Sequence, residues 1–406
     1  MSACAYVRFT RLRPRVTSMS LDLQFFDAVG ALDASQWDAL VADASPFLEH
    51  GFLVTLEETG CVGEGTGWYP QILGAFRDGE LVGALPLYLK TDSRGEFVFD
   101  WSWADAAHRA GMQYYPKAVV AVPFTPIEGR RILVDESQED AGAIRRALVE
   151  AAIDFAQRAQ LSSLHFNFVL PEEVELFEDL GLPIREGLQY HWYNGPDLGV
   201  GDDYGDFDDY LARFRSKKRS NIRRERRKLA EAGVTTKVLV GDEVTPAHLD
   251  RMFDYYRDTI EKFYWGKQYL NRAFFEQLGQ ALGDRVHMVV AEHDGREFAG
   301  AFNLWKGDGL YGRYWGCLDE IKYAHFEVCL YRAVEWCIDH GVQKFEPGAQ
   351  GEHKYDRGFM PTPTYSAHWV RHPGLARAIA DFIAQEKWEV ERQIEAMRED
   401  SPYKDG

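Results

Sequence analysis

One pattern of strand and helix signals occurs twice in this 406-residue sequence, and it favours a duplicated α/β fold. Asp78-Gly79 and Asp294-Gly295 each lie between two apolar segments that favour β-strands. Asp-Gly is a strong signal for a two-residue hairpin turn. After each turn we predict a returning strand, a third strand, a helix and a further strand. The repeat predicts two domains of one design, and the alternative is a chance similarity of two common arrangements.

The expected elements are short in both halves and follow the usual apolar periodicities. In the first half we expect strands at 71–76, 81–90, 96–101 and 118–124, a helix at 143–160 and a strand at 163–168. In the second half we expect strands at 286–292, 297–305 and 310–316, a helix at 325–340 and a strand at 342–345. The predicted fold class is therefore α/β, with mixed sheets flanked by helices.

Composition excludes several classes of protein. The net charge of −18 argues against a general DNA- or RNA-binding protein. No run of 18 apolar residues occurs, so we expect no transmembrane segment. The five cysteines show no spacing typical of metal ligands, and we expect free thiols in a reducing cytoplasm and no metal site.

Local composition also indicates where the domains begin and end. Residues 1–19 carry four arginines and no acidic residue, so we expect a disordered leader, with an organellar presequence as the alternative. Residues 195–209 are rich in glycine and acidic residues, which is typical of a domain boundary. We expect a first domain at 20–198, a second at 199–372, and an amphipathic helix with a tail at 373–406.

The densest group of reactive side chains lies in residues 345–361, after an apolar strand. Three glycines there would let the backbone approach a ligand closely. The loop carries two glutamates, a histidine, a lysine and an arginine among its polar residues. Binding and catalytic groups gather on such loops, although a solvated surface loop is the alternative interpretation.

Residues 213–228 form a second unusual segment, because ten of the sixteen are cationic. We predict a helix at 216–232 whose Ile222 and Leu229 face inward together with Phe214. Only Glu225 offsets the positive charge within the segment, so we expect a bound anion, with phosphate as the best candidate. A solvated helix surface is the alternative.

Several strings resemble the FemAB-like predicted N-acyltransferases, a branch of the Fem-type acyltransferases, and they span roughly residues 35–372. The strings are Arg219-Ser-Asn-Ile-Arg-Arg224 with Gly233-Val234, Pro46-Phe-Leu-Glu-His50 with Leu56-Glu-Glu-Thr-Gly60, Phe99-Asp-Trp-Ser-Trp-Ala-Asp105, Tyr114-Tyr-Pro-Lys117 with Val122-Pro-Phe-Thr-Pro126, and Glu346-Pro-Gly-Ala-Gln-Gly-Glu-His-Lys354 with Arg357-Gly-Phe359. The resemblance implies a tandem GNAT-like acyl-CoA N-acyltransferase fold, with two mixed sheets flanked by helices and a cleft where central strands splay apart.

The resemblance also implies an activity. Fem-type enzymes pass amino acids from aminoacyl-tRNA to peptidoglycan-precursor peptides. We therefore expect direct transfer of an acyl or aminoacyl group to an amine of a peptide, amino sugar or cell-wall precursor, without a tightly bound cofactor. The donor is either aminoacyl-tRNA or acyl-CoA. The glycine-rich coenzyme A motif is missing, because residues 127–131 hold one glycine and residues 318–322 hold none, and this disfavours acyl-CoA.

Candidate roles follow from the needs of acyl transfer. His353 has a suitable pKa to take the proton of the amine, with Glu352 or Glu346 as second choices. The resemblance implies that Lys354 stabilises the oxyanion, and we expect Arg357 to hold a phosphate or carboxylate. The other expected substrate-binding residues are Gly348, Gln350, Gly351, Lys217, Arg219, Asn221, Arg223, Trp101, Asp105 and Tyr115. Further aromatic residues expected at cleft walls, with ordinary core packing as the alternative for most of them, are Trp103, Tyr114, Tyr264, Trp265, Tyr314 and Trp315.

These roles require that the loop near residue 353 and the basic helix near residue 219 border one groove. A different class of function remains open, namely a non-catalytic protein that binds tRNA or another RNA through the helix at 213–228. Steep salt dependence of RNA binding without acyl transfer would support that class.

Overall fold

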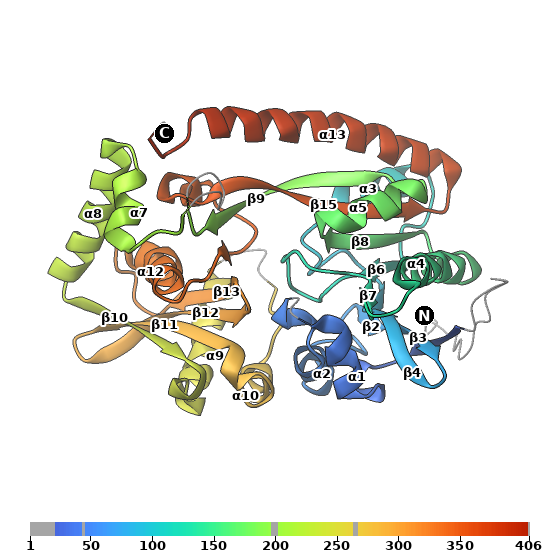
Figure 1. Cartoon of the computed structure of the whole chain (residues 1–406), viewed down its shortest axis with the longest axis horizontal. Helices are drawn as coiled ribbons and strands as arrows, with labels where there is room; N and C mark the ends of the chain where they lie inside the picture. Colours follow the sequence, from blue (N-terminus) through green and yellow to red (C-terminus); the bar gives the residue numbers. More distant parts are fainter. Residues whose placement is uncertain (1–20, 43–44, 196–201, 263–266, 405–406) are drawn as a thin grey trace. The chain divides into compact units, whose positions relative to one another are not determined.

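The computed structural model describes residues 21–42, 45–195, 202–262 and 267–404 (Figure 1). The expected leader at 1–19 and the expected cleft residues Tyr264 and Trp265 lie outside this part of the chain. The chain forms two compact units. Unit 1 comprises Met1–Gly187 and Thr364–Glu389, and unit 2 comprises Leu188–Pro363 and Val390–Gly406.

These units divide the chain differently from the expected domains at 20–198 and 199–372. The chain returns to unit 1 after Pro363, because the second part of strand β15 (Met360–Val370) pairs with strand β8 (Ser163–Val169). Helix α13 (Pro373–Glu399), expected as the C-terminal amphipathic helix, then begins in unit 1 and ends in unit 2. None of the helices in the described residues combines the length and the hydropathy that crossing a membrane requires.

Unit 1 contains two groups of paired strands. The first group has the order β1-β3-β4-β7, built from β1 (Asp22–Phe26), β3 (Ile72–Arg77), β4 (Glu80–Leu85) and β7 (Leu133–Val134). In the second group, β15 pairs with β8, which runs parallel to β6 (Lys117–Val120), and β5 (Leu87–Lys90) and β2 (Trp68–Pro70) follow. The helices are α1 (Ala34–Val41), α2 (His50–Glu58), α3 (Trp101–Arg109), α4 (Ala141–Arg158) and α5 (Pro171–Asp179).

Two expected strands of unit 1 differ in the structure. The strand expected at 81–90 is two strands, β4 and β5, separated by Pro86, which has no N–H to donate to a ladder. Residues 96–100 form a loop leading into α3, which begins at Trp101, and the third strand of the repeat is β6. Phe97 and Phe99 in this loop have φ values of 59° and 55°, a left-handed conformation that a strand cannot contain.

Unit 2 is built on one sheet. Its order is β10 (Val234–Val240), β11 (Val286–His293), β12 (Arg296–Lys306), β13 (Gly309–Cys317), β14 (Lys344–Glu346) and the last residues of β9 (Ile184–Tyr193). β13 and β14 are parallel, and the other neighbours are antiparallel. The two Asp-Gly turns are confirmed as equivalent hairpins, because Asp78 and Asp294 have φ values of 54° and 52° and both following glycines are also left-handed.

The helices of unit 2 are α7 (Phe207–Arg213), α8 (Ser216–Glu231), α9 (Pro246–Glu261), α10 (Arg272–Ala281) and a segment made of α11 (Ala324–Phe326), the π-helix Glu327–Tyr331 and α12 (Arg332–Asp339). The expected basic helix is α8, and Ile222, Leu229 and Phe214 are buried as predicted. α9 lies directly on β13, since a Cβ atom on Gly316 would come within 1.9 Å of the Tyr255 carbonyl oxygen. Only glycine fits at that position.

Candidate active site

A pocket of about 320 Å³ opens in unit 2 where β13 and β14 separate. The two strands pair in parallel from Gly309 with Lys344 to Tyr311 with Glu346, and beyond these residues the ladder ends. The register of β12 and β13 also shifts here, so that Arg313 is an extra residue in β13. The residues that line the pocket include Tyr256, Thr259, Asn303, Gly312, Arg313, Tyr314, Trp315, His325, Cys329, Gly348, Gln350, His353 and Lys354. The sequence-based expectation of a cleft at splayed strands therefore agrees with the structure.

The loop after β14 turns back over this pocket. Gly348 and Gly351 have φ values of 102° and 112°, a backbone conformation that residues with a Cβ atom rarely adopt. A Cβ atom on Gly351 would lie 2.6 Å from the ring of His353, so the glycine makes room for that imidazole. The 3₁₀-helix Glu352–Arg357 follows and directs Lys354 inward.

Lys354 is the most strongly perturbed cation of the pocket. Its side chain is only 6% exposed, and its Nζ donates a hydrogen bond of 2.7 Å to the Gly348 carbonyl oxygen. Burial lowers the pKa of Lys354 to about 8. The amine is therefore mostly charged at neutral pH, but it loses its proton far more readily than an ordinary lysine.

His353 lies beside Lys354 in the same loop. Its ring contacts the rings of His325 and Phe326, with centroids 5.3 Å and 5.5 Å away. Burial and the positive charges of Lys354 and Arg357 lower the pKa of His353 below 6.5. Burial and the same neighbours lower the pKa of His325 to about 4. Both imidazoles are neutral at pH 7, and a neutral imidazole is able to accept a proton.

Arg357 has a structural role that the sequence did not indicate. Its Nη2 lies 2.8 Å from Glu225 Oε1, its Nε lies 2.8 Å from the Tyr331 hydroxyl, and its Nη1 donates to the His353 carbonyl oxygen. The guanidinium also lies over the ring of Phe326. The expected role in binding a substrate anion is therefore corrected: Arg357 ties the loop to α8.

The two glutamates proposed as alternative bases also lie elsewhere. Glu346 is buried at the end of β14, where its carboxylate pairs with Lys344 at 2.9 Å and lies 3.7 Å from His191 Nε2. Glu352 is exposed on the 3₁₀-helix. Neither is among the residues that line the pocket, nor is Gly351, whereas Gly348 and Gln350 are.

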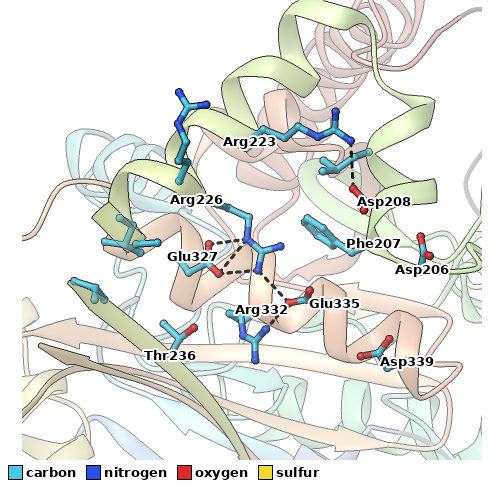
Figure 2. A pocket seen from close by; sticks show the side chains of 15 residues that line it. Asp206, Phe207, Asp208, Arg223, Arg226, Thr236, Glu327, Arg332, Glu335 and Asp339 are labelled. Carbon is cyan, nitrogen blue, oxygen red and sulfur yellow. Dashed lines mark hydrogen bonds and ion pairs between the residues drawn. The ribbon is translucent and has the colours of Figure 1, made fainter. Parts of the chain in front are cut away.

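The basic helix α8 is neutralised by carboxylates from other parts of unit 2. Figure 2 shows Arg226 between Glu327 and Glu335, at 2.9 Å and 3.1 Å, and Arg223 beside Asp208. Four further cations of residues 213–228 also pair with carboxylates, namely Arg213, Arg215, Lys218 and Arg227. The inference that this segment requires a bound anion is therefore wrong, because carboxylates both near to it and distant in sequence offset much of its charge.

Of the four α8 residues expected to bind substrate, two are engaged within the protein. Arg219 donates to the carbonyl oxygens of Ala212 and Phe214, and Arg223 pairs with Asp208. Lys217 is exposed and Asn221 is half-buried. Among the described residues, the cations of the segment without a carboxylate or carbonyl partner are Lys217, Arg224 and Lys228.

The loop and the basic helix contact each other but line different pockets. Lys218 pairs with Asp356, and Glu225 pairs with Arg357. However, residues of α8 line a second pocket of about 720 Å³ (Figure 2), together with Phe207, Thr236 and Glu335. No α8 residue lines the pocket at Lys354, and no residue of the loop lines the second pocket. The expectation of one common groove is corrected accordingly.

Three expected substrate-binding residues belong to unit 1. Trp101 and Asp105 are exposed on α3, and Tyr115 is half-buried with its hydroxyl 2.7 Å from Ser93 Oγ. None of them lines the unit 2 pocket. Nearby, the string Tyr114–Lys117 contributes a buried ion pair, because Lys117 Nζ lies 2.8 Å from Glu96 and also contacts Asp100.

Sequence reasoning missed several residues of the pocket. Asn303, Arg313, Cys329 and Thr259 line it, and none carries a motif of its own. Asn303, Arg313 and Cys329 lie in predicted strands and a predicted helix, and Thr259 lies in α9, a helix that the sequence analysis did not predict. Knowledge of the β12–β13 register shift would have indicated Asn303 and Arg313, but a single sequence does not show a bulge.

Known structures share the fold of this chain. One is L-PGS from Bacillus licheniformis, which is 11% identical, with 89% of this chain and 97% of that chain covered and a TM-score of 0.51. Another is the C-terminal domain of a putative lysylphosphatidylglycerol synthetase from Agrobacterium fabrum, 14% identical, with 87% and 96% covered and a TM-score of 0.52. No curated protein sequence matches this chain.

The family comparison covers nearly the whole chain. A family described as peptidoglycan biosynthesis/recognition matches residues 28–405. The two paired-strand units and the likeness to these structures confirm the expected α/β fold class. The chain belongs to the FemAB-like family.

Proposed function

We propose that this protein is a transferase that moves an acyl or aminoacyl group directly to the amine of a peptide, amino sugar or cell-wall precursor. The observation that carries the proposal is the pocket at the β13–β14 separation, which holds a neutral imidazole and a buried ammonium side by side. Family membership supports a role connected with peptidoglycan. This chemistry requires no metal and no covalent intermediate on the enzyme.

In the proposed reaction the amine nitrogen attacks the acyl carbonyl carbon, and the new C–N bond forms as the carbonyl oxygen becomes an oxyanion. His353 accepts the proton that the amine loses. The Lys354 ammonium has three donors, so it keeps its bond to Gly348 and donates another to the oxyanion. When the intermediate collapses, the leaving oxygen or sulfur takes the proton from the His353 imidazolium.

Aminoacyl-tRNA is the donor that we favour over acyl-CoA. In GNAT-type enzymes glycines at a helix start let backbone N–H groups hold the coenzyme A diphosphate. The corresponding segment here carries acidic residues, and Asp319 and Glu320 pair with Arg296 and Lys262. Residues 318–322 hold no glycine, so they do not supply the backbone N–H groups in the arrangement that coenzyme A requires. The unpaired cations Lys217, Arg224 and Lys228 on α8 provide contacts for phosphates of an RNA.

A transfer assay tests the proposal. The purified protein would be given radiolabelled aminoacyl-tRNA or acyl-CoA with a panel of amine acceptors, including nucleotide-linked peptide precursors. We expect His353→Gln and Lys354→Met to lower turnover by a factor of 10² or more. The control Glu352→Gln, which removes a charge from the same 3₁₀-helix, should retain activity. Salt-sensitive tRNA binding without any transfer would instead support the non-catalytic RNA-binding function.

A further inference from the structure

A polar side chain is buried in the middle of a central strand at the wall of the pocket. Asn303 of β12 is only 2% exposed, and it lines the pocket together with Gly312 and Lys354. A buried carboxamide destabilises a protein unless its donors and acceptors find partners. The partners of Asn303 therefore indicate why the strand contains asparagine here rather than an apolar residue.

One end of the carboxamide is fixed by His287. His287, Asn303 and Gly312 are direct partners across β11, β12 and β13, so the two side chains lie on the same face of the sheet. Asn303 Nδ2 lies 2.9 Å from His287 Nδ1. His287 is fully buried, burial lowers its pKa to about 3, and its ring packs on Trp336 at 4.6 Å. A neutral imidazole thus accepts the hydrogen bond and holds the amide in one orientation.

The other end of the carboxamide is open. With Nδ2 on His287, Oδ1 points toward Gly312, where an added Cβ atom would lie only 3.2 Å from it. The same Cβ atom would lie 3.1 Å from Pro347 Cα, so a side chain at position 312 would cover the oxygen. Within the part of the chain that the structure describes, no donor pairs with Oδ1. The pocket wall therefore presents a fixed hydrogen-bond acceptor.

We propose that Asn303 Oδ1 binds an N–H of the attacking amine, that His287 is the positioning residue for Asn303, and that the site selects primary amines. This inference rests on the proposed function. A neutral primary amine has two N–H groups and one lone pair. One N–H bonds Oδ1, the other bonds the neutral His353, and the lone pair stays directed at the acyl carbon. A secondary amine has a single N–H and loses one of these contacts.

Binding of two small probes tests the inference independently of transfer. Glycinamide and its N-methyl derivative would be titrated into the full-length protein, with binding followed by NMR. We expect wild type to prefer glycinamide, and Asn303→Leu to lower its affinity about tenfold and abolish the preference. Asn303→Asp retains an acceptor oxygen and should retain the preference. The proposal would be overturned if the wild type did not bind glycinamide, if Asn303→Leu bound glycinamide as tightly as the wild type or kept the preference, or if Asn303→Asp behaved like Asn303→Leu.

The role of His287 is tested by a double-mutant cycle. His287→Leu should weaken glycinamide binding, and adding it to Asn303→Leu should cause no further loss, whereas a purely structural histidine would give additive losses. In the transfer assay, Asn303→Leu should raise KM for the amine more than it lowers kcat. If wild type binds glycinamide with the expected preference but transfers nothing, the proposed function fails and this amine site stands. Unchanged KM in an active Asn303→Leu variant would overturn the inference alone.

Discussion

Replacing Lys354 by methionine should make the protein more stable at neutral pH. The folded-state pKa of about 8 lies about 2.5 units below the ordinary value of 10.5. Since one unit corresponds to about 1.4 kcal/mol, holding the buried ammonium lowers the free energy of unfolding by about 3 kcal/mol. Methionine has a similar length and no charge, so this cost disappears in the variant. The variant also lacks the hydrogen bond to the Gly348 carbonyl oxygen, which lowers its free energy of unfolding by about 1 kcal/mol. We expect a net gain of about 2 kcal/mol at pH 7.

The sign of this effect depends on pH in a defined way. A depressed lysine pKa means that the unfolded chain binds more protons between pH 8 and 10.5, so wild-type stability rises across that window. The advantage of Lys354→Met should therefore be full below pH 8 and shrink as the pH rises to 10. Urea unfolding from pH 6.5 to 10 measures this, with Lys228→Met on the exposed face of α8 as the control. A destabilised Lys354→Met variant, or a gain independent of pH, would refute the assignment of a buried, strained ammonium.

Three further predictions concern the site and its supports. At saturating amine, kcat should rise with pH as His353 loses its proton below pH 6.5, and it should fall near pH 8 as Lys354 loses its proton. Lys354→Arg should move the fall in kcat to higher pH. Gly316→Ala should cost about 2 kcal/mol or more, because the new methyl group meets the Tyr255 backbone, whereas Gly142→Ala in open space on α4 should be neutral or stabilising in thermal unfolding. Replacing Lys217, Arg224 and Lys228 by glutamine should reduce the salt dependence of tRNA binding by about two in the log–log slope, and an unchanged slope would exclude α8 as the phosphate contact.

The sequence predicted many of the strands and helices, because turn residues and apolar spacing act within short segments. The hairpins at Asp78 and Asp294 follow from turn chemistry, and the helix at α8 follows from its apolar spacing. The prediction of a strand at 96–101 was wrong, because the apolar and aromatic residues of this segment do not reveal that the backbone is left-handed at Phe97 and Phe99. The unit boundary also differed, because pairing of β15 with β8 joins residues about 200 positions apart.

The candidate site was predictable only in part, for electrostatic reasons. His353 and Lys354 were found because they lie together in one glycine-rich loop. The argument that the charge of α8 requires a bound anion was wrong, because Arg226 is neutralised by Glu327 and Glu335, about 100 positions away. Asn303 was missed for the same physical reason: its partner His287 is a neighbour only after β11 and β12 have paired. Charge balance and polar satisfaction are properties of the folded unit, so a linear segment does not determine them.

The two units differ at the point where their parallel central strands end. In unit 1, β6 runs parallel to β8 as β13 does to β14, with a helix between the strands in each case. The unit 1 ladder ends at Val120 with Phe166, and residues 129–131 then donate hydrogen bonds to the last residues of β8. Gly129 N donates to the Phe168 carbonyl oxygen at 3.1 Å, and the fully buried Arg131 donates from Nε to the Asn167 carbonyl oxygen at 2.7 Å. We therefore expect the proposed transfer to use the unit 2 pocket, and loss of His353 or Lys354 should not be compensated by unit 1.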